Sequence, residues 1–211
     1  MISVGIDVGG SKKGFHGVAL EGRKLIGKIH SSDVQQIVSW CTQTVFAEIV
    51  AVDAPCRWAQ EGKSRPAERQ LMGQRILCYS TPIRDVAVSH KTNFYGWVLR
   101  GEELFAALEP YFPLYTGKGS LESKCCFETF PHAITWHLRG GKASGKLKRI
   151  QRTELLRAAG IDTRSFQNID FIDAALCALA AQSYSKSDFC KYGEEETGYI
   201  IVPKMRAQLP V

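Results

Sequence analysis

The sequence lacks the features that mark membrane-spanning and exported proteins. None of its apolar runs approaches the roughly 20 residues that a helix needs to cross a bilayer. Its first residues do not combine a basic start with an apolar run, which is the pattern of a signal peptide. Heptad periodicity and internal repeats are also absent, which excludes a coiled coil and a repeat array. We therefore expect a cytoplasmic protein with no membrane partner.

The cysteines are not arranged as a metal site. There are seven of them, and none is spaced as C-x-x-C, so a zinc site is not expected. Without an export signal we expect reduced thiols, several of them buried. No cysteine lies beside both a helix-start signal and an identifiable base, which disfavours a cysteine nucleophile. The seven are Cys41, Cys56, Cys78, Cys125, Cys126, Cys177 and Cys190.

Acidic residues are scarce in one stretch of the chain. The 211 residues are 45% hydrophobic and 23% charged, as in an ordinary globular protein with one core, and the net charge is +6. Residues 139–157 contain seven basic residues and a single acid, Glu154. The net charge of this basic stripe is therefore +6, the same as that of the whole chain. Such a stripe fits a polyanionic partner such as nucleic acid. A solvated helix rich in Lys and Arg explains the composition at least as well.

The first quarter of the sequence predicts three strands, a helix and a central strand. A helix is expected over Val34–Phe46, preceded by capping residues at Ser31-Ser32-Asp33. The segment Glu48–Asp53 is nearly all apolar, which is typical of a strand buried on both faces. The three preceding strands are expected at Ile2–Asp7, Phe15–Leu20 and Lys24–His30, joined by turns that contain glycine.

The middle of the chain is harder to assign. We interpret residues 56–124 as an insertion that caps one end of the sheet and helps to select the substrate. Its expected elements are a helix over Ser64–Arg75, mixed structure over Tyr79–Asn93, a short helix over Glu102–Leu108 and a loop over Tyr111–Ser120. The elements expected after it are a strand at Cys125–Phe130, helices at Pro131–Leu138, Lys146–Ala159 and Asn168–Ser183, an acidic turn at Gly193–Thr197 and a strand at Tyr199–Val202.

Five carboxylates stand at positions suited to a shared site. Asp7 and Asp53 end the first and central strands, which can be neighbours in a mixed sheet. Glu128 lies in a later strand, and Asp170 and Asp173 lie three residues apart in the last helix. Taken singly, Asp53 could initiate a turn, Asp170 could cap the helix and Glu128 could pair with an arginine. Asp173 resists such an explanation, because it is followed by Ala-Ala-Leu, where an unpaired charge is costly.

This acidic cluster predicts a magnesium or manganese site. Clustered carboxylates repel one another unless a cation sits between them, and oxygen ligands suit Mg²⁺ or Mn²⁺. Two such ions can activate a water and stabilise the leaving oxygen in phosphodiester hydrolysis. The acidic cluster and the basic stripe together therefore favour a metal-dependent nuclease or phosphodiesterase.

Five motifs, in order, carry a resemblance to a known family. They are GIDVGGSKKG, AVDAP, RPAER, FETFPHA and DAALCALAA. From Gly5 to Pro203 the sequence resembles the domain-of-unknown-function 429 family, whose members are predicted nucleases of the ribonuclease-H-like superfamily. The segment DFIDAALCALAA is also similar to the last helix of bacterial Holliday-junction resolvases, which carries two acids three residues apart.

The resemblance implies a fold. It is an α/β ribonuclease-H-like fold, a five-stranded mixed sheet with the first three strands antiparallel, flanked by helices. A single domain would cover residues 1–211, with the insertion at about 56–124. Ribonuclease H proper carries a catalytic Glu in the helix after the third strand, whereas Val34–Phe46 contains no acid. This departure favours a resolvase-like arrangement over cleavage of an RNA–DNA hybrid.

The resemblance also implies site residues. Asp7, Asp53 and Asp173 match catalytic ligands of Mg²⁺ or Mn²⁺, Asp170 is an auxiliary acid, and Glu128 matches the family's own acidic motif. From their charge, we expect a set of cations to hold backbone phosphates, which would affect affinity more than sequence choice. These cations are Lys12, Lys146, Lys148, Arg149 and Arg152. The expected partner is nucleic acid of unspecified type, and a homodimer is an open option.

Two other function classes stay open beside the nuclease. The segment IDVGGSKKG resembles the phosphate-binding hairpin of actin-like, ATP-dependent sugar kinases, but a second such glycine motif is missing and 211 residues are few for two lobes. A non-catalytic nucleic-acid-binding protein could keep the same fold. His16 and His132 could carry protons near the site, although a histidine at a helix start is more often structural.

Overall fold

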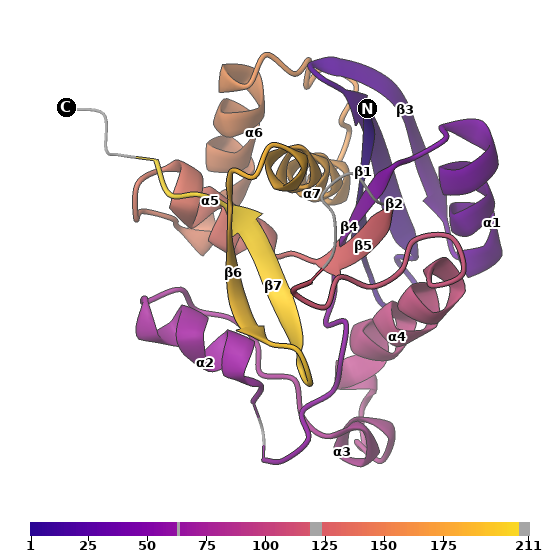
Figure 1. The fold of residues 1–211 in the computed structure, drawn as a ribbon, viewed down its shortest axis with the longest axis vertical. Helices are drawn as coiled ribbons and strands as arrows, with labels where there is room; N and C mark the ends of the chain where they lie inside the picture. Colours follow the sequence, from indigo (N-terminus) through magenta and orange to yellow (C-terminus); the bar gives the residue numbers. More distant parts are fainter. Residues whose placement is uncertain (63, 119–123, 207–211) are drawn as a thin grey trace.

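A seven-stranded mixed sheet forms the centre of the molecule (Figure 1). The structure is a computed structural model that describes residues 1–62, 64–118 and 124–206. The strand order is β3-β2-β1-β4-β5-β7-β6. The strands are β1 (Ile2–Val8), β2 (Phe15–Glu21), β3 (Lys24–Ser31), β4 (Ile49–Asp53), β5 (Cys125–Glu128), β6 (Phe189–Glu194) and β7 (Gly198–Pro203).

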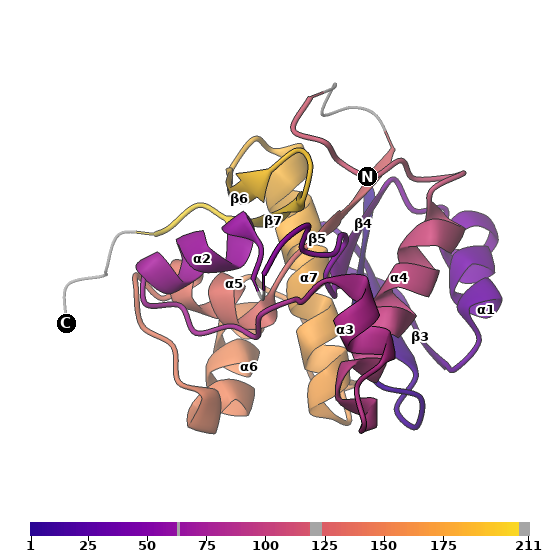
Figure 2. The ribbon, with the colours of Figure 1, turned by 90° about the horizontal axis from the view of Figure 1, so that it is seen from below.

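Helices cover both faces of this sheet (Figure 2). The long helix α7 crosses one face over β1, β2 and β4, while α1 and α4 pack on the other. The α-helices are α1 (Val34–Ser39), α2 (Pro66–Gly73), α3 (Arg84–Val88), α4 (Gly96–Leu108), α5 (Pro131–Leu138), α6 (Lys148–Ala158) and α7 (Ile169–Ser185). Three short elements complete the set: a π-helix η1 (Trp40–Thr44) and two 3-10 helices, η2 (Asn93–Tyr95) and η3 (Gly145–Leu147). Among the described helices, none is long and apolar enough to span a membrane.

The first five strands follow the predicted arrangement. Strands β1, β2 and β3 form an antiparallel meander, and β1, β4 and β5 run parallel to one another. The register places Asp7 opposite Asp53, at the carboxyl ends of β1 and β4. Because side chains alternate between the faces of a strand, Gly5 and Asp7 face the same side as Ala51 and Asp53.

Helix α7 lies directly on β1 because a glycine leaves room for it. A Cβ atom on Gly5 would be 2.0 Å from the carbonyl oxygen of Ala174 and 2.2 Å from the nitrogen of Ala178. No side chain fits there, and the alanines on α7 keep the helix backbone close to the strand. The first turns of α7, which carry Asp170 and Asp173, are thereby held near the end of β1.

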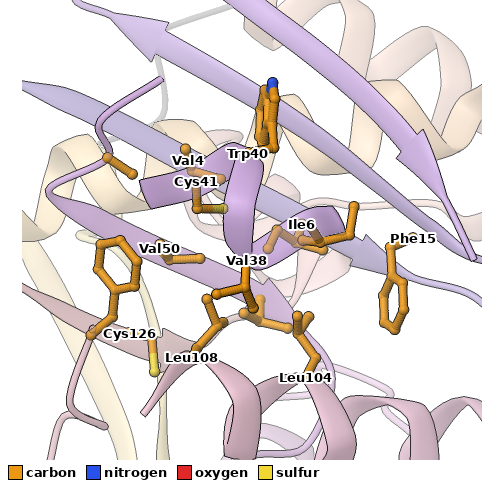
Figure 3. Packing of buried hydrophobic residues seen from close by; sticks show 14 of the residues in the cluster. Val4, Ile6, Phe15, Val38, Trp40, Cys41, Val50, Leu104, Leu108 and Cys126 are labelled. Atoms are coloured by element: carbon orange, nitrogen blue, oxygen red, sulfur yellow. The ribbon is translucent and has the colours of Figure 1, made fainter. Parts of the chain in front are cut away.

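The opposite face of the sheet is covered by an apolar core (Figure 3). Side chains of β1 and β4 meet α1 and α4 there, and they are almost completely buried. The cluster includes Val4, Ile6, Val38, Val50, Leu104 and Leu108. This core holds the two central strands rigidly in register, and with them the carboxylates at their ends.

The sheet has seven strands, so the prediction of five is wrong. Strand β7 matches the strand predicted at Tyr199–Val202, whereas β6 was not predicted. The two form an antiparallel hairpin whose turn lies in the acidic segment predicted at 193–197, and one pair, Glu128 with Ile200, joins β7 to β5. The sequence of β6, FCKYGE, alternates poorly between apolar and polar residues and contains a glycine, which hides the strand.

The region expected to be a cap also contributes to the core. Helix α2 confirms the helix predicted over 64–75, and the short helix predicted at 102–108 is the second half of α4. Helix α4 packs on the sheet face through Leu104 and Leu108, so this part of the insertion belongs to the core. The stretch of mixed structure at 79–93 contains α3. In the loop predicted over 111–120, Leu114 bridges to β5, and residues 119 and 120 lie outside the described residues.

Candidate functional site

Asp7 and Asp53 lie side by side at one edge of the sheet. They are partners in the parallel register of β1 and β4, and both are partly buried. Both side chains face α7 because of strand alternation. Two of the predicted ligands are therefore brought together by the sheet itself, as the sequence predicted from the strand ends.

The surroundings of these two carboxyl groups oppose their ionisation. Burial, reinforced by the charges of Asp173 and Asp170, raises the pKa of Asp7 to about 8, against the opposing effect of Lys13 and Arg152. Burial and the neighbouring Asp7 raise the pKa of Asp53 well above its usual range. Two carboxylates that cannot both ionise without a counter-charge form a natural place for a cation or a proton.

The first turns of α7 supply two further acids. The side chain of Asn168 caps the helix by accepting a hydrogen bond from the N–H of Phe171 at 2.9 Å, so Asp170 is not needed as the cap. Asp170 instead accepts a hydrogen bond from Nζ of Lys13 at 3.1 Å, which joins α7 to the glycine hairpin between β1 and β2. The predicted auxiliary acid therefore lies in the site region but is already paired.

Asp173 is the most constrained acid in the site. Only 6% of it is exposed, and Oδ1 accepts a hydrogen bond from Nη1 of Arg152 in α6, which is exposed to the same extent. Burial raises the pKa of Asp173, while Arg152 and Lys148 work in the opposite direction. The unpaired charge that the sequence made hard to explain is therefore matched by an arginine.

The predicted phosphate-binding cations divide into two groups. Arg152 is buried in its ion pair with Asp173, whereas the other four are exposed. Lys146 lies in η3 and Lys148 begins α6, and Arg149 donates a hydrogen bond to the carbonyl oxygen of Gln167 at 3.2 Å. Lys12 lies in the glycine hairpin. The basic stripe is therefore not only a solvated helix face, because one of its members reaches the acidic cluster.

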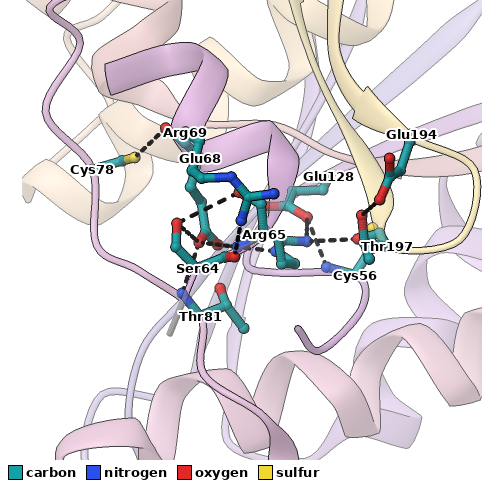
Figure 4. Close-up of polar contacts among 10 residues, drawn as sticks. All are labelled: Cys56, Ser64, Arg65, Glu68, Arg69, Cys78, Thr81, Glu128, Glu194 and Thr197. Carbon is teal, nitrogen blue, oxygen red and sulfur yellow. Dashed lines mark hydrogen bonds and ion pairs between the residues drawn. The ribbon is translucent and has the colours of Figure 1, made fainter. Parts of the chain in front are cut away.

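Glu128 is held in a different network from the aspartates (Figure 4). Arg65 donates to both of its oxygens, from Nη2 to Oε1 at 2.6 Å and from Nη1 to Oε2 at 2.7 Å. The backbone N–H of Cys56 donates to the same Oε2 at 2.8 Å. Arg65 is 1% exposed and Glu128 is 4% exposed. The structure therefore agrees with the interpretation in which Glu128 pairs with an arginine.

The second acid in this network, Glu68, was not predicted to matter. It accepts from Nε of Arg65 at 2.9 Å and from the backbone N–H groups of Arg65 and Thr81, each at 2.9 Å. One buried arginine thus serves two buried carboxylates and ties α2 and the insertion to β5. The available signal was the Arg-x-x-Glu spacing in RPAER at the start of α2, which predicts a local pair but not its partner in β5.

The fit of a divalent cation depends on Asp7 and Asp53. In residues 1–62, 64–118 and 124–206, no three His, Cys, Asp or Glu side chains converge closely enough to form a preassembled metal cage. The predicted trio of Asp7, Asp53 and Asp173 is therefore not assembled as a cage, because Arg152 occupies the third carboxylate. Mg²⁺ commonly uses only one or two carboxylates, together with waters and substrate phosphates. The repelling pair at the ends of β1 and β4 fits that requirement.

The two histidines named as proton carriers have other surroundings. His16 stacks on His30 with ring centroids 4.4 Å apart, and burial lowers its pKa. His132 is half-buried near the start of α5, where burial and the charge of Arg152 lower its pKa. Of the two, His132 is the one whose pKa is affected by Arg152, the partner of Asp173.

Comparisons with known proteins assign the chain to a family but not to an activity. No curated protein matches the sequence, and no solved structure matches it. One family model, described as a protein of unknown function (DUF429), matches residues 5–197, which is more than nine-tenths of the chain. The matched region contains the carboxyl end of β1, all of β4, the insertion and α7. The chain therefore belongs to the DUF429 family.

Proposed function

We propose that the protein is a metal-dependent hydrolase of nucleic-acid phosphodiester bonds. The observation that carries the proposal is the pairing of Asp7 with Asp53 under the start of α7, where burial and repulsion raise both pKa values. A purely structural site would gain stability from losing one of these charges. Two carboxyl groups at the ends of two parallel strands are better explained by a cationic cofactor and an anionic substrate.

In this proposal Asp7 and Asp53 hold Mg²⁺ or Mn²⁺. When bound, the ion supplies Lewis-acid stabilisation of the phosphate and lowers the pKa of a water that attacks phosphorus. Asp173 does not need to be a ligand in the resting protein, because its role is to orient Arg152. This differs from the three-aspartate ligand set expected from the family resemblance, and one metal ion suffices for the arrangement.

Arg152 is the residue of this chain best placed to contact the scissile phosphate. Its charge acts on Asp7, Asp53 and Asp173 alike, which places the guanidinium within the cluster. Its Nε atom is buried and has no hydrogen-bond partner within the described residues. A buried donor without a partner is costly, and a phosphate oxygen would satisfy it. Lys146, Lys148 and Arg149 would hold neighbouring phosphates along α6.

The ribonuclease-H-like fold is part of the same proposal. The antiparallel meander followed by two parallel strands supports it, as does the last helix lying across the sheet face. On this view the hairpin of β6 and β7 extends a five-stranded core. The absence of an acid in α1 continues to favour a resolvase-like site over hybrid cleavage.

The proposal is tested by cleavage of labelled DNA, RNA, hybrid and branched substrates in magnesium, in manganese and in chelator. We expect metal-dependent cutting that Asp53→Asn abolishes, and cutting that persists in chelator or in this variant would refute the proposal. Asp188→Asn is the matched control, because Asp188 is exposed beyond the opposite end of α7. A folded protein that binds nucleic acid but cuts none of these substrates would favour the non-catalytic alternative.

The kinase alternative finds less support in the hairpin at residues 9–14. The backbone N–H groups of Gly9, Lys13 and Gly14 donate to carbonyl oxygens of the same hairpin, at 2.9, 2.9 and 3.0 Å. Phosphate binding by a glycine loop requires such N–H groups to be free. Measured ATP binding by the purified protein would support the kinase alternative.

A further inference from the structure

An exposed aromatic cluster lies in the insertion, on residues that the proposed chemistry does not use. Tyr79 is 71% exposed and Phe94 is 50% exposed, with ring centroids 6.1 Å apart. Phe94 contacts Tyr95 with ring centroids 4.9 Å apart, and His90 lies against both rings. We call Tyr79, His90, Phe94 and Tyr95 the aromatic platform. Large exposed rings that contact one another indicate a binding surface more often than scattered single rings do.

The aromatic platform is connected to the acidic cluster by two adjoining hollows. An open groove of about 380 Å³ is lined by Leu77, Cys78, Tyr79, Phe130, His132 and Gly145. A small cavity of about 50 Å³ shares Cys78, Tyr79 and Phe130 with that groove and reaches Asp53. Tyr79 and Asp53, a proposed metal ligand, therefore line the same cavity.

Positive charge lies beside the same groove. Gly145 also lines this groove, and the exposed Lys146, Lys148 and Arg149 follow it in η3 and at the start of α6. Figure 1 places α6 and α3 on opposite sides of α7, and Figure 2 shows both beside the same end of that helix. A ligand in this groove would therefore meet the exposed ring of Tyr79 and reach the cations that follow Gly145 in the sequence.

We propose that the aromatic platform binds unpaired bases, so that the substrate of the proposed hydrolase is a single-stranded segment of nucleic acid. The bases stack on Tyr79 and Phe94 while the backbone runs past Asp53 toward α6. Stacking on aromatic rings combined with a basic track is the usual chemistry of single-strand binding. Base faces in a duplex are covered by their neighbours and cannot use these rings. This inference rests on the proposed function for the direction of the strand across the site.

The test is equilibrium binding in chelator, which separates binding from cleavage. Fluorescence anisotropy with a labelled oligothymidylate, and with its duplex with oligoadenylate, is measured at one salt concentration. Wild-type protein should bind the single strand more tightly than the duplex, although the higher charge density of the duplex favours it for phosphate contacts alone. Tyr79→Ala and Phe94→Ala should each weaken single-strand binding at least about five-fold, and Tyr79→Phe should retain it.

A matched control lies at the other end of α4. Tyr111 is 54% exposed just after that helix, whereas Phe94 lies just before its start. The 13 residues of α4 separate the two by about 20 Å. Tyr111→Ala should bind the single strand as wild type does. Thermal melting of all variants establishes that each is folded, which we expect because the replaced rings are exposed.

Several results would overturn the inference. Equal or tighter binding of the duplex, or unchanged single-strand binding by the Tyr79→Ala/Phe94→Ala double variant, contradicts it. If the wild type is a dimer and the double variant is a monomer with unchanged oligonucleotide affinity, the platform is instead a contact surface for a second copy of the chain. Cleavage of duplex substrates that does not depend on the platform refutes this inference and supports the proposed function. If single-strand binding depends on the rings but the protein cuts none of the substrates, the role of the platform is supported and the proposed hydrolase activity is refuted.

Discussion

Glu128 offers the sharpest distinction between a structural and a catalytic carboxylate in this protein. The perturbation is Glu128→Gln, which keeps the shape of the side chain and removes its charge. In the structure both oxygens of Glu128 accept from the guanidinium of Arg65, at 2.6 and 2.7 Å, and Arg65 is 1% exposed. If the ion pair is the role of Glu128, the substitution leaves a buried arginine with only Glu68 as its counter-charge.

The expected cost follows from the burial of the pair. Breaking a buried ion pair by removing one partner typically costs about 3 to 5 kcal/mol, because the remaining charge stays out of water. For a chain of this size, each kcal/mol lowers the melting temperature by about 2 to 4 °C. We therefore expect Glu128→Gln to lower the melting temperature by roughly 6 to 20 °C. The variant should also lose cleavage in proportion to its loss of folded protein.

The assay is thermal and urea unfolding in chelator, with two comparisons. Glu154→Gln makes the same change in an exposed pair, where Glu154 accepts from Nη1 of Arg139 at 3.0 Å, and should cost less than about 1 kcal/mol. Asp53→Asn removes a carboxylate of the repelling pair and should not destabilise the protein. An unchanged or raised melting temperature in Glu128→Gln, with cleavage abolished, would refute the reasoning and make Glu128 a catalytic residue.

Three further predictions concern the strands and helices that build the site. In chelator, Asp53→Asn should raise the melting temperature because it removes a carboxyl group whose ionisation is opposed by burial and by Asp7. Mn²⁺ should stabilise the wild type but not the variant, and stabilisation of both by Mn²⁺ would contradict the assigned ligands. The folded protein holds the proton of Asp7 up to about pH 8, whereas the unfolded chain releases it near pH 4. The contribution of Asp7 to the free energy of unfolding is therefore fully present below pH 4 and is lost as the pH rises to 8. This loss is on the order of 5 kcal/mol at most. Urea unfolding in chelator should therefore show Asp7→Asn gaining stability over the wild type as pH rises, and a constant difference would argue against this. Gly5→Ala should cost about 1 to 3 kcal/mol or more in the same assay, since its Cβ would meet the backbone of α7 2.0 Å from an oxygen, and a neutral effect would refute the close packing.

Local patterns in the sequence determined the central strands and the positions of two acids. The alternating residues of β1 and the apolar run of β4 each end in an aspartate, and parallel neighbours bring such ends together. The alanine-rich segment after Asn168 determined α7. These features were predictable because they depend on period, propensity and caps within a few consecutive residues.

The partners of the charged residues were decided only by the tertiary structure. Arg65 meets Glu128 across 63 positions of sequence, and Arg152 meets Asp173 across 21. Strand β6 forms because β7 offers it an edge, and the aromatic platform exists because Tyr79 and Phe94 come together in the folded insertion. Each pairing depends on which segments pack side by side, and a buried charge takes whichever counter-charge that packing supplies. Local sequence shows that these residues need partners, but only the packing determines which partners they find.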